Sequence, residues 1–268
     1  MEKIAFIITV YKKDNPVFFK ESIDSIINQN YGFDNINIYL GVDGELTDEL
    51  NEYILKNQSK FYKIVRNTEN KGLAFTLNRL IEVLEDEVYV FRMDSDDVCT
   101  VNRVTEQVNF LASSEALIVG SNLIEIDENG SKIREKKMPI SNKEIVNYSI
   151  SRSPLNHPTV AFKKVFFDKV GVYNESFIKA QDYELWARAL KKEIVIANIS
   201  SPLLYFRITK DYLTKRNSVS NFFNEFKVSI SLMNHYRKYI QLPKILTKLL
   251  IRLMPPVIGA YFYNKVRN

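Results

Sequence analysis

Short apolar runs alternate with amphipathic segments through the first 120 residues, and this alternation limits the fold more than any other feature of the chain. Strands that alternate with helices predict βαβ units and a mostly parallel sheet with helices on both faces. The strand-like runs are continuously apolar, as burial on both faces requires. The expected strands span 4–10, 36–42, 61–66, 88–93 and 116–119, and the expected helices span 18–29, 47–56, 73–84 and 103–111.

The composition is that of a globular protein. A chain of 268 residues with 46% hydrophobic residues can bury a sizeable core as one large domain or two small ones. The single cysteine, Cys99, excludes an internal disulfide and a cysteine-based metal site, which fits a reducing cytoplasm. The first residues lack a signal-peptide pattern, and apolar runs are too short to predict a spanning helix.

The positive charge is concentrated in the tail. The net charge is +5, and the segment from Arg207 onward holds 12 Lys or Arg against Asp211 and Glu225, so the preceding part is net acidic. This asymmetry predicts an anionic partner for the tail, either a membrane surface or nucleic acid.

Polar residues follow four of the expected strands. Ligands bind beyond the carboxyl ends of parallel strands, so these residues are candidates for a binding crevice. Asp43-Gly44 also fits an ordinary turn, and the segment 70–72 also fits a simple helix start. The four groups are Thr9-Val10-Tyr11, Asp43-Gly44, Asn67 to Gly72 and Asp94 to Asp97.

Three carboxylates follow the apolar run 88–93, at Asp94, Asp96 and Asp97. Clustered carboxylates repel one another unless a cation lies among them, and Mg²⁺ or Mn²⁺ takes oxygen ligands together with substrate phosphates. The pattern favours a metal-phosphate site. A solvated acidic turn after a strand is the structural alternative.

The second half is less regular. It contains an expected hairpin, 122–126 with 131–136, that turns at Asn129-Gly130. A short strand at 159–162 and a helix at 180–190 follow. Asp182 falls in the first turn of that helix, where the helix dipole favours a negative charge. The functional alternative is a general base at the helix start.

These motifs together resemble the family-2 glycosyltransferases, closest to bacterial enzymes that build surface polysaccharides. The resemblance covers residues 4 to about 207, and six separated motifs agree in order and spacing. The residues that carry it are Ile8-Thr9-Val10-Tyr11, Val42-Asp43-Gly44, Asn70 to Ala74 with Asn78, Arg92 to Asp97, Arg103 with Gln107, His157-Pro158, and Gln181 to Trp186 with Arg188.

The resemblance implies the GT-A fold, an α/β architecture with a mostly parallel, Rossmann-like sheet flanked by helices. It implies a catalytic domain over 1–206, with a nucleotide-binding half at 1–120 and an acceptor-binding half at 121–206. Residues 207–268 are expected to form a basic, amphipathic helical extension. The implied reaction is an inverting transfer of a sugar from a UDP-sugar to a saccharide acceptor, with Mn²⁺ or Mg²⁺ as cofactor.

The resemblance also assigns roles to residues. Asp182 corresponds to the catalytic base, Asp96 to the metal ligand, and Asp97 to support of the loop. Candidate contacts to the acceptor or the donor sugar are His157, Gln181 and Trp186, although His157 also fits a structural imidazole. The expected nucleotide-sugar contacts are Thr9, Val10, Tyr11, Asp43, Lys71, Arg79, Arg92, Asp94 and Ser95, with Asp43 at the uracil edge and Asp94 at the ribose.

Two positions depart from the family pattern. Many relatives have Glu-Asp where this chain has Gln181-Asp182, so an acidic neighbour of the base is replaced by an amide. Many relatives also have a histidine shortly after the last strand, where this chain has Thr209. Water or phosphate would then fill that metal position.

The tail predicts attachment to a membrane. Lys244, Lys248 and Arg252 recur every four residues and form one basic stripe on a helix, beside a wide apolar face. The apolar segment 257–263 follows a Pro-Pro break. Such a helix is typical of an anionic membrane surface, and the alternative is a helix packed on the domain. The protein is therefore expected in the cytoplasm, peripheral on the inner membrane face, acting on an acceptor carried by a lipid diphosphate.

Other functions fit less well. A phosphatase-like hydrolase would place its Asp-x-Asp after the first strand, and a calcium loop would need a glycine and a glutamate that are absent here. Nucleic-acid binding lacks a recognised module, so no nucleic-acid partner is expected. A non-catalytic homologue that binds nucleotide sugars remains an alternative.

Overall fold

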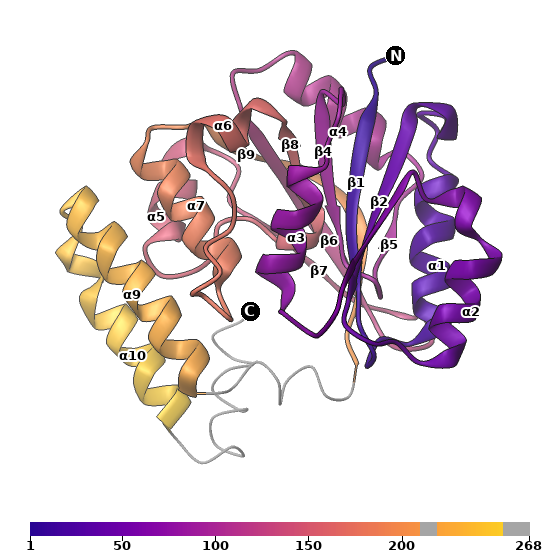
Figure 1. Cartoon of the computed structure of the whole chain (residues 1–268). Coiled ribbons are helices and arrows are strands. Elements are labelled where there is room, and N and C mark those ends of the chain that lie inside the picture. The colour runs from indigo at the N-terminus through magenta and orange to yellow at the C-terminus, as the bar shows by residue number, and fades with distance from the viewer. Residues whose placement is uncertain (210–218, 254–268) are drawn as a thin grey trace.

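The computed structural model describes residues 1–209 and 219–253 (Figure 1). Its first half follows the predicted alternation of strands and helices. Asn15 caps α1 by accepting from the backbone N–H groups of Val17 and Phe18, and Thr47 caps α2. The elements are β1 (Ile4–Val10), α1 (Pro16–Ile27), β2 (Ile36–Asp43), α2 (Asp48–Lys56), β3 (Lys63–Asn67), α3 (Leu73–Glu82) and β4 (Tyr89–Met93), with short 3₁₀ turns at Phe33–Asn35 and Gln58–Lys60.

The first four strands form a parallel sheet in the order β3-β2-β1-β4. All four therefore end at the same edge, where the polar groups of the sequence follow them. This part of the sheet confirms the predicted parallel architecture, and β1, β2 and β4 are buried on both faces.

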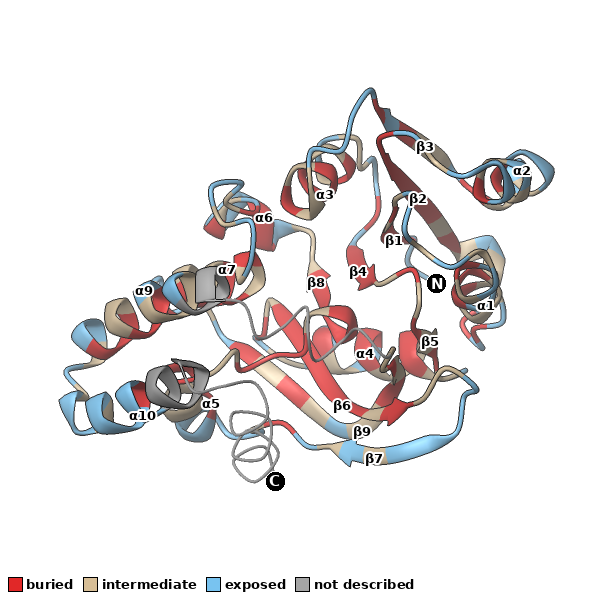
Figure 2. Ribbon diagram, turned by 90° about the horizontal axis from the view of Figure 1, so that it is seen from below, coloured by how far each residue is buried: buried red, intermediate tan, exposed pale blue. Residues whose placement is uncertain are grey.

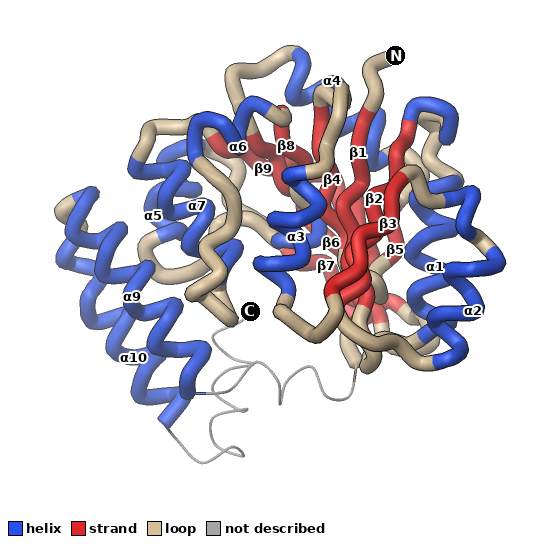
Figure 3. Tube along the Cα trace, in the orientation of Figure 1, coloured by secondary structure: helices blue, strands red, loops and turns tan. Residues whose placement is uncertain are grey.

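The second half extends the same sheet with mixed pairing. β8 pairs antiparallel with β4, and β9 pairs parallel with β6. The elements are β5 (Val98–Cys99), α4 (Arg103–Ala112), β6 (Ile118–Ile126), β7 (Lys132–Lys136), α5 (Asn142–Ser149), a 3₁₀ turn at His157–Thr159, β8 (Ala161–Lys163), α6 (Val165–Val170), α7 (Gln181–Lys191) and β9 (Ile196–Arg207). The full path is β3-β2-β1-β4-β8-β6-β9-β5, with β7 on β6 (Figure 3).

Helices cover both faces of the sheet, so the core has two layers (Figure 2). One layer packs α1, α2 and α4 on the sheet through residues such as Phe19, Leu50 and Val104. The other packs α3, α5, α6 and α7 through residues such as Leu77 and Trp186. Burial of apolar surface on both faces is the main stabilising contribution in such a fold.

The chain ends, within the described part, in two helices, of which α9 lies beside α7 and α10 packs on α9 (Figure 1). They are α9 (Val219–Tyr236) and α10 (Leu242–Leu253), joined by a 3₁₀ turn at Tyr239–Gln241. Val228, Leu232, Met233 and Ile245 are buried in the second core layer. Within residues 1–209 and 219–253, the structure contains no helix with the length and apolar character needed to cross a bilayer.

Several boundaries differ from the sequence expectations. The runs 116–119 and 122–126 are one strand, β6, and the strand expected at 159–162 is β8, after a 3₁₀ turn. The hairpin at Asn129-Gly130 is present, with Gly130 at a φ of 83°. α10 packs on α9, and Ile245 is buried. The apolar face of this helix therefore fits the alternative of a tail helix packed on the domain. The apolar segment 257–263 lies outside the described residues.

Candidate active site

The loop after β4 brings the three carboxylates together. One oxygen from each of Asp94, Asp96 and Asp97 lies within 4.8 Å of the other two. The loop is tied to α1, because Ser22 Oγ donates to the Asp94 carbonyl over 3.0 Å. The tertiary structure therefore holds the cluster in place, which a simple solvated turn would not require.

The three carboxylates differ in burial and in partners. Asp94 is 32% exposed and pairs with the buried guanidinium of Arg92. Asp97 is fully buried and accepts from the Arg207 backbone N–H over 3.0 Å. Its Oδ2 has no hydrogen-bond partner within the described part of the chain. A buried carboxylate oxygen without a donor is costly and fits a cation ligand.

Burial and mutual repulsion raise the pKa values in this cluster. Burial, with the Asp94 charge as the next cause, raises the pKa of Asp96 to about 6. Burial and the Asp96 charge raise the pKa of Asp97 well above its usual value. A divalent cation would remove this penalty, because it favours the charged form of each carboxylate. Oxygen ligands of this kind suit Mg²⁺ or Mn²⁺.

A fourth carboxylate, Asp14, joins the site from the loop after β1. Its Oδ2 accepts from the Tyr11 backbone N–H over 3.0 Å. Burial raises its pKa to about 7, hydrogen bonds with Tyr11 and Ser95 oppose the shift, and the charges of Asp96 and Asp94 add to it. Asp14 thus links the Tyr11 loop to the carboxylate loop after β4.

Asp43, at the end of β2, organises the loop that follows β3. Its two oxygens accept from the backbone N–H groups of Lys71 and Gly72 over 2.8 and 2.9 Å. Asp43 Oδ1 also accepts from Asn67 Nδ2 over 2.9 Å. Arg79 joins the same network by donating to the Asn67 amide oxygen. The Lys71 ammonium turns outward and pairs with Glu69.

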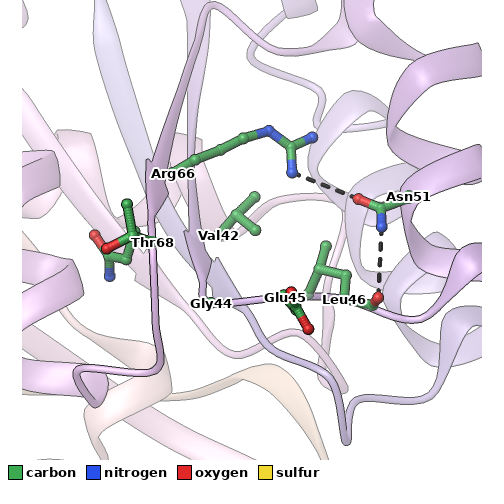
Figure 4. Close-up of a pocket in the computed structure, with 8 residues that line it drawn as sticks. Val42, Gly44, Glu45, Leu46, Asn51, Arg66 and Thr68 are labelled. Atoms are coloured by element: carbon green, nitrogen blue, oxygen red, sulfur yellow. Dashed lines mark hydrogen bonds between the residues drawn. The ribbon is translucent and has the colours of Figure 1, made fainter.

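A cavity of about 410 Å³ opens beside this network, at the ends of β2 and β3 (Figure 4). Figure 4 shows Arg66 and Asn51 approaching each other across it, with Arg66 Nη1 3.5 Å from Asn51 Oδ1. Gly44, at a φ of +85°, permits the close approach of the two loops, since an added Cβ would lie 2.7 Å from the Asn70 nitrogen. The residues that line the cavity are Val42, Gly44, Glu45, Leu46, Asn51, Arg66, Asn67 and Thr68.

Asp182 lies in the first turn of α7, as predicted. The residue before the helix, Ala180, has a left-handed backbone with φ 62° and ψ 24°. Ser153 Oγ donates to Asp182 Oδ2 over 3.4 Å. Tyr173 is buried, and burial raises the pKa of its hydroxyl; the Arg92 charge opposes this shift, and the charges of Asp182 and Asp94 add to it.

His157 packs beneath this region. Its Nε2 lies 2.8 Å from the Tyr173 hydroxyl, and its ring centroid lies 6.1 Å from that of Trp186. Burial and the Arg92 charge hold its pKa well below the usual value, so His157 is neutral at physiological pH. Trp186 has no exposed surface, so in this structure it packs behind His157 and does not face the site.

The sequence matches the model of the family described as glycosyl transferase family 2 over residues 5–171. The chain belongs to this family. A relative from Escherichia coli, UDP-Gal:alpha-D-GlcNAc-diphosphoundecaprenol beta-1,3-galactosyltransferase, is 32% identical over 98% of this chain and 96% of its own length. The amylovoran biosynthesis glycosyltransferase AmsE of Erwinia amylovora is 29% identical over 98% of both chains.

Solved structures agree with this family-2 assignment at the level of the fold. The crystal structure of S. aureus TarS matches with a TM-score of 0.67 and 16% sequence identity over 93% of this chain. This chain spans 43% of the TarS chain. Further TarS structures, of residues 1–349, contain UDP or UDP-GlcNAc. The predicted GT-A fold and glycosyltransferase class are confirmed.

Sequence reasoning did not assign a role to Arg207, which contacts the carboxylate loop of this family-2 site from the end of β9. Its Nε donates to the Asp96 carbonyl over 3.0 Å, and its guanidinium lies 4.1 Å from the Phe18 ring centroid. It also donates to Glu21 and to the carbonyls of the β6–β7 turn. Arg207 therefore joins β9, α1 and the carboxylate loop.

Two motif residues of the glycosyltransferase resemblance are core residues. Arg103 is fully buried and donates to the carbonyls of Arg92 and Val160. Gln107 is also fully buried and donates to the carbonyls of Val119 and Thr159. Both stabilise the junction of β4, β6 and β8 below the site.

Proposed function

We propose that this protein transfers a sugar from a UDP-sugar to a saccharide acceptor carried on a lipid diphosphate, with inversion at the sugar. The observation that carries the proposal is the carboxylate cluster after β4, with its fully buried Asp97, together with Asp182 at the start of α7. The UDP and UDP-GlcNAc complexes of TarS and the diphosphoundecaprenol acceptor of the E. coli relative support the choice of substrates.

The nucleotide would lie along the carboxyl ends of β1, β2 and β4. Thr9, Val10 and Tyr11 would line the base and the ribose, with Asp43 beside them. The cavity next to Gly44 offers space of the size that binding sites for small molecules have. Further proposed contacts to the nucleotide sugar are Lys71, Arg79, Arg92, Asp94 and Ser95.

A divalent metal, Mn²⁺ or Mg²⁺, would be held by Asp96, with Asp94 and the unpartnered Asp97 oxygen beside it. Such an ion would neutralise the charge that develops on the nucleoside diphosphate as the sugar departs. Arg92 holds Asp94 through their ion pair, and Arg207 holds the Asp96 carbonyl. Both residues thereby fix the loop that positions the carboxylates.

Asp182 would take the proton from the attacking hydroxyl of the acceptor. One base on the face opposite the leaving group is sufficient for inversion, by the geometric argument used for glycoside hydrolases. Ser153 orients its carboxylate. Gln181 and His157 are the proposed neighbours of the sugars, and Trp186 supports His157 from behind.

The proposed organisation is a catalytic domain over 1–206, with a nucleotide half at 1–120 and an acceptor half at 121–206, and a helical extension over 207–268. A basic extension and a lipid-linked acceptor together favour a peripheral position on the inner face of the cytoplasmic membrane.

The test is Asp182→Asn in the purified full-length protein. Removal of the base is expected to lower the transfer rate by roughly 10²–10⁴-fold, while metal-dependent stabilisation by UDP in thermal unfolding is retained. Ser153→Ala, which removes only an orienting hydroxyl, is the control and is expected to lose much less. Unchanged turnover of Asp182→Asn would exclude Asp182 as the base.

A further inference from the structure

Two large apolar side chains are exposed where the loop before α7 meets the first part of α9. Ile178 is 83% exposed and lies four residues before Asp182, and Phe223, near the start of α9, is 57% exposed. Among the described residues, few apolar side chains are as exposed as Ile178. Exposure of large apolar groups close to a site marks a candidate contact with an apolar partner.

The two residues belong to segments that are joined in the structure. Asn224, the neighbour of Phe223, donates from Nδ2 to the carbonyl of Lys179, the neighbour of Ile178, over 3.1 Å. Beneath them, Phe177, Ala180 and Phe226 pack against the core layer that contains Trp186. Ile178 and Phe223 therefore lie on a part of the structure that is packed on the core, where the loop before α7 meets α9.

Exposed cations accompany these apolar residues. Lys179 follows Ile178 directly, and Lys227 is four residues after Phe223, so it lies on the same face of α9. Of the nearby acids, Glu175 accepts from Asn78 and Glu225 is half-buried. We call Ile178, Lys179, Phe223 and Lys227 the entrance patch.

We propose that the entrance patch binds the lipid end of the acceptor, with Ile178 and Phe223 against the polyisoprenoid chain and Lys179 and Lys227 near its diphosphate. This inference rests on the proposed function, because it assigns the partner of the same site. A chain of hydrocarbon attached to a diphosphate needs adjacent apolar and cationic contacts. The patch offers both, and Ile178 and Lys179 lie within four residues of Asp182 in the chain, where the attached sugar would react.

The position of the entrance patch also determines which end of the α9–α10 pair would face the membrane. The opposite end of the α9–α10 pair carries Ile240, which is 92% exposed, and Tyr239, which is 56% exposed. Figure 1 shows that this end lies away from the start of α7, whereas the beginning of α9 lies near it. The proposal assigns lipid contact to the beginning of α9 and not to the turn at Tyr239–Gln241.

The experiment measures co-sedimentation of the full-length protein with phosphatidylcholine vesicles that contain undecaprenyl diphosphate. The double variant Ile178→Ser/Phe223→Ser is expected to bind roughly 10- to 100-fold more weakly, since burial of each side chain contributes to binding in proportion to its apolar area. Ile240→Ser is the matched control, because it removes a more exposed apolar residue from the other end of the same helix pair, and it is expected to bind like the unaltered protein.

Two further arms separate the possible sources of binding. Lys179→Gln/Lys227→Gln is expected to reduce the gain that undecaprenyl diphosphate gives over plain vesicles. Vesicles with phosphatidylglycerol in place of undecaprenyl diphosphate are expected to bind more weakly. Equal binding to the two kinds of vesicle would overturn the proposal in favour of a general anionic surface. If Ile240→Ser lost as much vesicle binding as Ile178→Ser/Phe223→Ser, the assignment of lipid contact to the entrance patch would be wrong.

Stabilisation by UDP with Mn²⁺ is measured on the same variants to keep the two proposals distinguishable. It is expected to be unchanged, because the entrance patch does not include the proposed nucleotide contacts. Failure of the unaltered protein to bind UDP would count against the proposed function. Retained UDP binding with unaltered vesicle binding in Ile178→Ser/Phe223→Ser would count against the patch alone.

Discussion

At the scale of single residues, the acidic site is a group of carboxylates held together against their repulsion. Asp94, Asp96 and Asp97 come from one loop, and Asp14 is added from another. Hydrogen bonds from Tyr11 and Arg207 to Asp14 and Asp97 offset part of the repulsion. The remaining cost appears as raised pKa values, which make the stability of the metal-free protein depend on pH.

The metal-free protein is expected to lose stability as the pH rises from about 4 to about 8. In Asp14→Asn this loss is expected to be smaller. The pKa of Asp14 is raised to about 7, above its value in the unfolded chain. Between these two pKa values the folded protein binds a proton that the unfolded chain has released, so stability falls as the pH rises, by up to about 1.4 kcal/mol per pH unit. Urea unfolding at both pH values measures the effect.

The two proteins should differ least near pH 4, where Asp14 is neutral in the folded protein and only partly ionised in the unfolded chain, and the variant should be the more stable near pH 8. Part of the fall should persist in Asp14→Asn, because the pKa values of Asp96 and Asp97 are also raised. Identical pH dependence in the two proteins would show that Asp14 titrates normally.

Arg207 is a positioning residue, and Arg207→Lys tests this role. Lysine keeps the charge but loses the planar fork that reaches the Asp96 carbonyl, Glu21 and the β6–β7 turn together. The free energy of unfolding is expected to fall by about 2–4 kcal/mol. Stabilisation by UDP with Mn²⁺ should weaken as well, because the Asp96 loop loses an anchor.

Arg134→Lys is the control for this substitution. Arg134 also forms an ion pair, with the buried Glu125, but it lies on β7 of the hairpin. Its replacement is expected to leave stabilisation by UDP with Mn²⁺ unchanged in thermal unfolding. An equal effect of the two variants on UDP binding would mean that Arg207 acts only on global stability.

Local sequence predicted the carboxylates of one loop but not the residues that join it from elsewhere. Asp94, Asp96 and Asp97 lie within four positions, so a strand followed by acids was sufficient to find them. Arg207 reaches the same loop from 111 residues further along the chain. Such a contact depends on the pairing of β9 with β6 and β5, which no short motif encodes.

At the scale of elements, the prediction of β6 was also limited by contacts between distant parts of the chain. The sequence predicts two strands, at 116–119 and 122–126, whereas β6 continues through Gly120 and Ser121. A Cβ at position 120 would lie 2.5 Å from Asn198 Oδ1, so glycine is needed there for the close approach of β9. Glycine in a strand can thus mark tight packing as well as a turn. The hairpin at Asn129-Gly130 was predictable because its turn is local.

The start of α7 places the base, and it contains a strained residue. Ala180 adopts a left-handed backbone with a φ of 62°, which costs an L-residue about 1–2 kcal/mol. Ala180→Gly removes this cost and loses about 0.4–1 kcal/mol through the more flexible unfolded chain. A small net gain in the free energy of unfolding is expected, measured by urea denaturation.

Ala187→Gly in the middle of the same helix is the matched control. Ala187 is helical and buried, so the substitution there is expected to destabilise the protein by about 1 kcal/mol. Opposite signs for the two alanines would support strain at the helix start. Similar losses at both positions would show that Ala180 is not strained.

At the scale of the whole molecule, the helical extension is part of the structure that holds α7. The Tyr183 hydroxyl of α7 lies 3.2 Å from Ser229 Oγ of α9, and Tyr236 of α9 donates to the Leu190 carbonyl. The sequence predicted a basic, amphipathic extension but did not show which apolar face would be buried. That choice depends on the complementary surface of α7 and α5, which is formed by distant parts of the chain.

A chain that ends at residue 209 is therefore expected to be markedly less stable than the full chain. It would lose the buried side chains of Val228, Leu232, Met233 and Ile245 and expose their partners around Trp186. Burial of each such side chain contributes about 1.5–3 kcal/mol, which together is comparable to the whole stability of a typical domain.

Thermal unfolding and limited proteolysis of the chain that ends at residue 209 should show an earlier transition that begins in the α7 region. If the chain ending at 209 unfolds at the same temperature as the full chain, α9 and α10 contribute no stability to the sheet, and the position of Asp182 depends on residues 1–209 alone.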